Sequence, residues 1–152
     1  MLRIAAGAVV ALLASSGPAL AQQPGFEPAY GSADLSAADD HRIELKAGGH
    51  EDASRVGRGC VGMVADYPDF VFNYTPGEAP LIITATSRAD TTLLLNFPDG
   101  SWACNDDGGE GDPNPGIVIH RPPAGRYDVW VGAKQPHPAP DAVLRISATL
   151  ED

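Results

Sequence analysis

Short runs in which apolar and polar residues alternate dominate the chain from residue 41 onward. A period of two places every second side chain on the same face of a β-strand. In residues 69–74, for example, Phe70, Phe72 and Tyr74 share one face. The same pattern, or a β-branched apolar run, predicts further strands over residues 41–46, 81–86, 91–97, 117–119, 126–131 and 142–150.

Turn-forming residues separate these runs, since the chain holds 17 glycines and 14 prolines. The Pro98-Asp99-Gly100 turn, for instance, leads into a short return strand. No stretch carries a helical period of useful length, and no internal repeat is visible. Strand-like runs at roughly 8–12 residue intervals with turns between them predict an all-β fold, an antiparallel β-sandwich.

The N-terminal residues 1–21 have the features of a signal peptide. Arg3 supplies a positive charge, residues 4–14 are apolar, and Ala19-Leu20-Ala21 is a small-x-small cleavage signal. This apolar run is too short to span a membrane. We therefore expect a periplasmic or secreted protein with a flexible lead-in at 22–40, where large apolar residues are few, and one domain at 41–150.

Charge and cysteine content narrow the class of protein further. With 20 acidic and 10 basic residues the net charge is −10, which argues against nucleic acid or an anionic membrane as the partner. We expect a monomer.

Cys60 and Cys104 lie in an exported chain without CxxC spacing, which predicts one structural disulfide. Metal binding or nucleophilic catalysis by either cysteine is the alternative.

An acidic, glycine-rich loop follows the return strand. Calcium takes six to eight oxygen ligands from carboxylates, amides and carbonyls. The loop supplies such oxygens from Asn105, Asp106, Asp107, Glu110 and Asp112, and the hairpin brings Asp90 and Asp99 near it. A calcium site is one interpretation. In the other, Asn105 and Asp107 only cap a turn through side-chain to backbone hydrogen bonds, and Asp99 is first of all a turn residue.

A second candidate site lies on the strand at 126–131. If Tyr127, Val129 and Val131 face the core, Asp128 and Trp130 face the other side, where Trp130 could contact a sugar ring or a protein. Alternatively, the lead-in or a loop covers Trp130. Trp102 is expected to pack beside the disulfide.

Signatures of catalysis are missing from the sequence. The histidines do not stand at zinc-ligand spacing, and neither HExxH nor Gly-x-Ser-x-Gly occurs. We therefore expect no enzyme activity. A secreted hydrolase, either a peptidase with a triad assembled in space or a glycosidase using Asp106 and Asp107, is an alternative.

Five motifs occur in a fixed order: Asp90-Thr-Thr-Leu, Pro98-Asp-Gly, Asn105-Asp-Asp-Gly, Asn114-Pro-Gly-Ile and Ala124-Gly-Arg-Tyr-Asp-Val-Trp-Val-Gly. Their order resembles the bacterial pre-peptidase C-terminal domain. Cys60-Val-Gly and Pro68-Asp-Phe resemble a stand-alone exported variant with paired cysteines. The resemblance implies a jelly-roll-like sandwich without catalysis, often associated with calcium.

Together these features predict an exported accessory or binding β-domain, stabilised by calcium, with a protein or a glycan as its partner. A metal-free structural protein of the cell envelope is the other non-enzymatic alternative.

Overall fold

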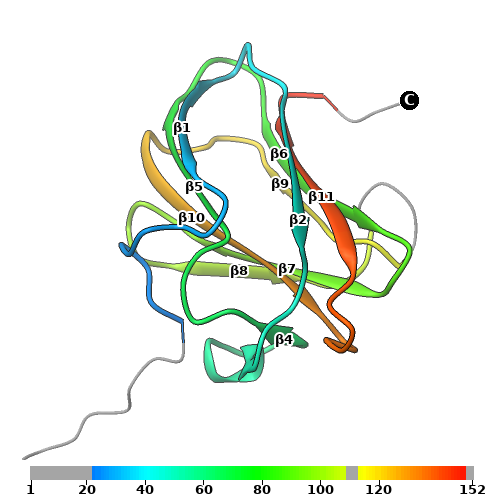
Figure 1. Cartoon of the computed structure of the whole chain (residues 1–152). Helices are drawn as coiled ribbons and strands as arrows, with labels where there is room; N and C mark the ends of the chain where they lie inside the picture. The colour runs from blue at the N-terminus through cyan, green and yellow to red at the C-terminus, as the bar shows by residue number, and fades with distance from the viewer. Residues whose placement is uncertain (1–21, 109–112, 150–152) are drawn as a thin grey trace, which may run out of the picture.

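The computed structural model describes residues 22–108 and 113–149. These residues form two β-sheets packed face to face, with a single-turn 3₁₀ helix, η1 (Ala53–Arg55), beside one of them (Figure 1). The strands are β1 (Ser32–Ser36), β2 (His41–Lys46), β3 (Glu51–Asp52), β4 (Met63–Val64), β5 (Phe70–Thr75), β6 (Leu81–Ser87), β7 (Thr91–Asn96), β8 (Trp102–Asn105), β9 (Gly116–Ile119), β10 (Gly125–Ala133) and β11 (Asp141–Ser147).

The larger sheet has seven strands arranged around β10. β10 pairs with β5 and β4 and with β7, while β1, β3 and β8 extend the sheet. The smaller sheet has the order β2-β11-β6-β9. Every pair is antiparallel except β1 with β5. The prediction of an all-β, mainly antiparallel sandwich is confirmed, and each strand that the sequence predicts is present.

The core between the sheets follows the alternation along the strands. Phe70, Phe72 and Tyr74 all point into it, as the pattern in β5 predicts. The rings of Phe72 and Tyr127 stack with centroids 4.9 Å apart. Leu93, Leu95, Leu144 and Ile146 fill the space from β7 and β11. Burial of these apolar faces makes the main favourable contribution to the free energy of packing the two sheets together.

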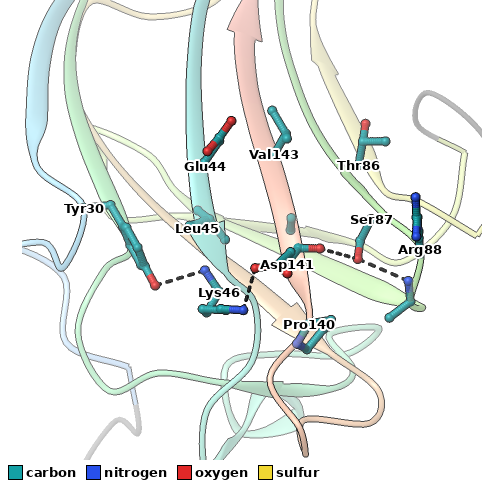
Figure 2. A pocket seen from close by; sticks show the side chains of 12 residues that line it. Tyr30, Glu44, Leu45, Lys46, Thr86, Ser87, Arg88, Pro140, Asp141 and Val143 are labelled. Carbon is teal, nitrogen blue, oxygen red and sulfur yellow. Dashed lines mark hydrogen bonds and ion pairs between the residues drawn. The ribbon is translucent and has the colours of Figure 1, made fainter.

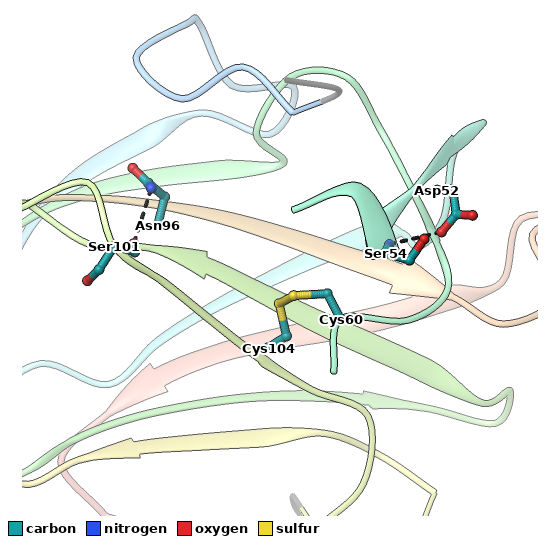
Figure 3. Close-up of a disulfide and its surroundings, with 6 residues drawn as sticks. All are labelled: Asp52, Ser54, Cys60, Asn96, Ser101 and Cys104. Carbon is teal, nitrogen blue, oxygen red and sulfur yellow. Dashed lines mark hydrogen bonds between the residues drawn. A yellow bond between two sulfur atoms is a disulfide. The ribbon is translucent and has the colours of Figure 1, made fainter. Parts of the chain in front are cut away.

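A second, smaller core lies on the opposite face of the larger sheet. Trp130 and Leu94 project there and are covered by Ala53 and Val64. The Cys60–Cys104 disulfide joins the covering loop to β8 (Figure 3), which confirms the predicted disulfide. Both faces of this sheet are therefore buried around β10.

Residues 22–40 differ from the flexible lead-in that the sequence predicts. β1 lies here and pairs in parallel with β5. Ahead of it, the amides of Gln23, Ala29 and Tyr30 donate to the carbonyls of residues 66, 68 and 69 at 2.8–2.9 Å. This segment is held in place mainly by backbone hydrogen bonds. Its apolar residues do not alternate with polar ones over a long enough stretch to predict a strand.

No helix among the described residues is long and apolar enough to cross a membrane.

Candidate functional site

The acidic loop contributes to a cluster that already contains a cation. Lys134, which follows β10, places its Nζ atom 3.3 Å from Asp90 Oδ2 and 3.2 Å from Asp106 Oδ2. These two carboxylates raise the pKa of Lys134, Asp106 having the larger effect. Asp90 and Asp106, two of the residues that we expected to bind calcium, thus lie on either side of one positive charge.

The other predicted ligands are engaged differently. Asp99 Oδ1 accepts hydrogen bonds from the Ser101 hydroxyl at 2.6 Å and the Ser101 amide at 2.9 Å. These bonds lower the pKa of Asp99. Asn105 Oδ1 accepts from the amide of Gly116 at 3.1 Å, and Asp107 is exposed. Asp99 therefore acts as a turn cap, and Asn105 joins the loop to β9.

Glu110 and Asp112 lie outside the described residues. Among the described candidates, Asp90 and Asp106 converge on Lys134, and one oxygen each of Asp99 and Asn105 is used elsewhere. Within the described part of the chain, Asp90, Asp106 and Asp107 do not form a group of three with their carboxylate oxygens close together.

Trp130 and Asp128 do face away from the main core, but both are covered. Trp130 is 0% exposed and packs against Trp102, with ring centroids 5.2 Å apart. Asp128 is 3% exposed. It accepts hydrogen bonds from Arg126 at 2.9 Å and from the amide of Gly25 at 3.1 Å. A loop covers the tryptophan and the N-terminal segment covers the aspartate, so neither offers the ligand-contact surface proposed from the sequence.

An open groove of about 890 Å³ crosses the outer face of the smaller sheet (Figure 2). It passes over the adjacent strands β2, β11 and β6. Val143 and Thr86, neighbours in the register of β11 and β6, form part of its floor. Tyr30 stands at one end of the groove and Arg88 at the other. The groove therefore extends from the N-terminal segment to the end of β6.

The polar side chains around this groove are balanced in charge and partly fixed. Lys46 Nζ lies 2.5 Å from Asp141 Oδ1, and Glu44 and Arg88 add one negative and one positive charge. The Tyr30 hydroxyl accepts a hydrogen bond of 3.0 Å from the amide of Lys46. Because β2 is an edge strand, this bond satisfies a backbone donor and holds the tyrosine ring beside the sheet.

Sequence reasoning missed this groove because its residues are scattered along the chain. Tyr30 belongs to a segment that seemed featureless, and Arg88 lies in a turn. The feature of the sequence that pointed to the groove was the set of outward-facing polar positions in the strands at 41–46, 81–86 and 142–150. Their adjacency depends on the order β2-β11-β6, which alternation alone does not determine.

The described residues contain no hydrogen bond from a serine or threonine hydroxyl to a histidine. Such a pair is what a Ser-His type of nucleophile would use. The groove combines an aromatic ring, apolar floor positions and charged groups of both signs, which is chemistry suited to holding a ligand.

The structure thus defines a disulfide-bonded β-sandwich domain with an open groove on its smaller sheet. No family model matches the chain, and no curated protein matches it. Among solved structures, it is similar to the pre-peptidase C-terminal domain of a collagenase from Bacillus anthracis. The two are 12% identical, the alignment covers 76% of this chain and 92% of that one, and the TM-score is 0.41. This is the same kind of domain that the sequence motifs resemble.

Proposed function

We propose that the protein is an exported, non-catalytic accessory domain that binds its ligand in the groove on the smaller sheet. The groove itself carries the proposal, because it presents a fixed aromatic ring beside an open, mixed polar and apolar floor. Export is supported by the signal-like residues 1–21 and by the disulfide, since disulfides persist in oxidising compartments such as the periplasm or the extracellular space.

A neutral oligosaccharide is the ligand that this groove fits best. Glu44 and Asp141 balance Lys46 and Arg88, so the groove has no strong preference for a charged ligand. The same four side chains offer both donors and acceptors for hydroxyl groups. Tyr30 is 37% exposed and is held in place through its own hydroxyl, which leaves its ring available for stacking on a sugar.

Affinity electrophoresis in gels that contain neutral soluble polysaccharides, such as xylan, β-glucan and amylose types, tests this proposal. At least one polysaccharide should retard the protein, and Tyr30→Ala should remove most of the retardation. Val143→Arg should do the same by filling the floor, without removing the hydroxyl bond to Lys46. Tyr67→Ala is the matched control, because Tyr67 is 47% exposed and does not line the groove.

Retardation that persists equally in the Tyr30 and Val143 variants would contradict the groove as the site. No retardation in any of the gels would contradict the glycan as the ligand. A protein partner would then be the better assignment, provided that the same two variants abolish its binding.

We further propose that calcium stabilises the acidic loop, with Asp90, Asp106 and Asp107 as its ligands. The supporting observation is that Asp90 and Asp106 already share a cation in Lys134. A calcium ion binding there would take the place of the lysine ammonium group. Binding only the folded state stabilises it by about 2.7 kcal/mol at a hundredfold excess of ion over Kd.

Thermal melting in calcium and in chelator tests the calcium proposal. The wild type should melt several degrees higher in calcium, and magnesium should do less because it requires tighter octahedral geometry. Lys134→Met should enlarge the calcium effect because it removes the competing charge, whereas Asp106→Asn should reduce it. Equal melting temperatures in millimolar calcium and in chelator would end this proposal and leave the groove proposal untouched.

A further inference from the structure

His50, Glu51 and Asp66 bring one imidazole and two carboxylates together beside the β3–β4 hairpin. One candidate ligand atom from each residue lies within 4.8 Å of the other two. His50 and Glu51 are consecutive, and Asp66 follows β4 by two residues. The antiparallel pairing of Glu51 with Val64 places these two segments next to each other.

Backbone contacts hold these segments together without help from the three side chains. A Cβ atom added at Gly49 would lie 2.2 Å from the carbonyl carbon and oxygen of Val64, so only glycine fits where the chain passes β4 before His50. On the other side, the amide of Gln23 donates a 2.9 Å hydrogen bond to the carbonyl of Asp66. The cluster is therefore built on fixed backbone.

Asp66 adds an observation at the level of a single atom. Its side chain is 37% exposed as a whole, but its Oδ1 atom is buried and makes no hydrogen bond. The atom lies 3.5 Å from His50 Nε2, which is longer than a good hydrogen bond. Buried polar atoms are rarely left unpaired, because removing them from water costs free energy that a partner must offset. A cation between the carboxylate and the imidazole would provide that partner.

Glu51 can contribute one oxygen to the same ion. Its Oε2 atom pairs with Arg55 at 3.1 Å, which leaves the other carboxylate oxygen available. The Arg55 side chain is 65% exposed, so the pair can rearrange at little cost. Two carboxylates would balance the charge of a divalent ion.

We propose that His50, Glu51 and Asp66 bind a divalent transition-metal ion, with zinc the best match. Zinc accepts imidazole nitrogen and carboxylate oxygen at about 2.0–2.2 Å, whereas calcium and magnesium prefer oxygen alone. Ligand atoms on one tetrahedral zinc ion are about 3.4 Å apart at these bond lengths. The cluster must therefore contract by up to about 1.4 Å, which the exposed His50 side chain permits. Water completes the coordination.

Titration of zinc against a chromophoric chelator, with the purified protein at pH 7.5, tests this site. We expect one zinc ion per chain, with the affinity reduced at least tenfold by His50→Gln and by Asp66→Asn. Arg55→Met should raise the affinity several-fold, since it frees Glu51 and removes a positive charge. His120→Gln is the matched control, because His120 is an exposed histidine just after β9 on the other sheet. Far-UV circular dichroism checks that each variant folds.

Cobalt substitution gives a readout of the ligands themselves. The visible absorption of bound cobalt should change in His50→Gln and stay unchanged in His120→Gln. Failure of the protein to compete with the chelator for zinc would overturn the proposal and leave only a side-chain contact between His50 and Asp66. Zinc binding that the His50 and Asp66 variants leave intact would also overturn it, by placing the ion elsewhere on the acidic surface.

Discussion

Replacement of Asp69 by asparagine should stabilise the protein in a strongly pH-dependent way. Asp69 lies just before β5, is 3% exposed, and accepts a 2.7 Å hydrogen bond from the amide of Val131 through Oδ2. Burial raises the pKa of its carboxyl group from 3.8 to about 7, although the Val131 hydrogen bond opposes the shift. Asparagine is nearly isosteric and keeps an oxygen that can accept the same hydrogen bond.

The sign of the effect follows from proton uptake. Between pH 3.8 and about 7 the folded state holds a proton on Asp69 that the unfolded state has lost, so stability falls as the pH rises. Below this window the carboxyl is protonated in both states, and above it the full penalty applies. One pKa unit corresponds to about 1.4 kcal/mol, so the roughly three-unit shift amounts to about 4 kcal/mol.

Urea unfolding of wild type and Asp69→Asn at pH 4, 5, 6, 7 and 8 measures this directly. The difference between the two free energies of unfolding should be small near pH 4 and should grow to about 4 kcal/mol in favour of the variant at pH 8. Taking the difference cancels the contribution of other titrating groups. A difference that is independent of pH, or a variant that is less stable at pH 8, would refute the reasoning.

Two further predictions concern the loop that covers the smaller core. Replacing Cys60 and Cys104 together by alanine opens a bridge that spans 44 positions, and chain entropy alone should then cost about 4 kcal/mol in urea unfolding. Titration of the unreduced, unfolded wild type should find no free thiol. Gly49→Ala should lower the melting temperature markedly because its Cβ would collide with the β4 backbone, whereas Gly57→Ala, whose Cβ would meet only a sulfur at 3.9 Å, should change it little.

The sequence was sufficient to predict the strands in which apolar and polar side chains alternate. Phe70, Phe72 and Tyr74 repeat with a period of two because every second position of β5 faces the core. The same rule correctly turned Trp130 away from that core. It did not indicate that a loop would cover the tryptophan, because this depends on where the chain segment before Cys60 folds back.

The candidate sites were harder to predict because they depend on long-range pairing. The pattern gave no strand at β3 or β4, each of which has two residues, too few to establish a period. Their pairing nevertheless brings His50 to Asp66. Likewise, the motif Asn105-Asp-Asp suggested a shared ion, but a lysine from beyond β10 lies between two of the acidic residues. Composition identified the charges without showing how they would pair.

The position of β1 also has a consequence for solubility. An uncovered edge strand can template pairing with other chains, and β5 has the aromatic sequence Phe-Val-Phe-Asn-Tyr-Thr that favours such contacts. β1 occupies this edge along residues 71–75 and replaces it with a short, acidic strand, Ser-Ala-Asp-Leu-Ser. Loss of the N-terminal segment, by proteolysis or truncation, would therefore expose the edge of β5 and favour self-association of the domain through strand pairing.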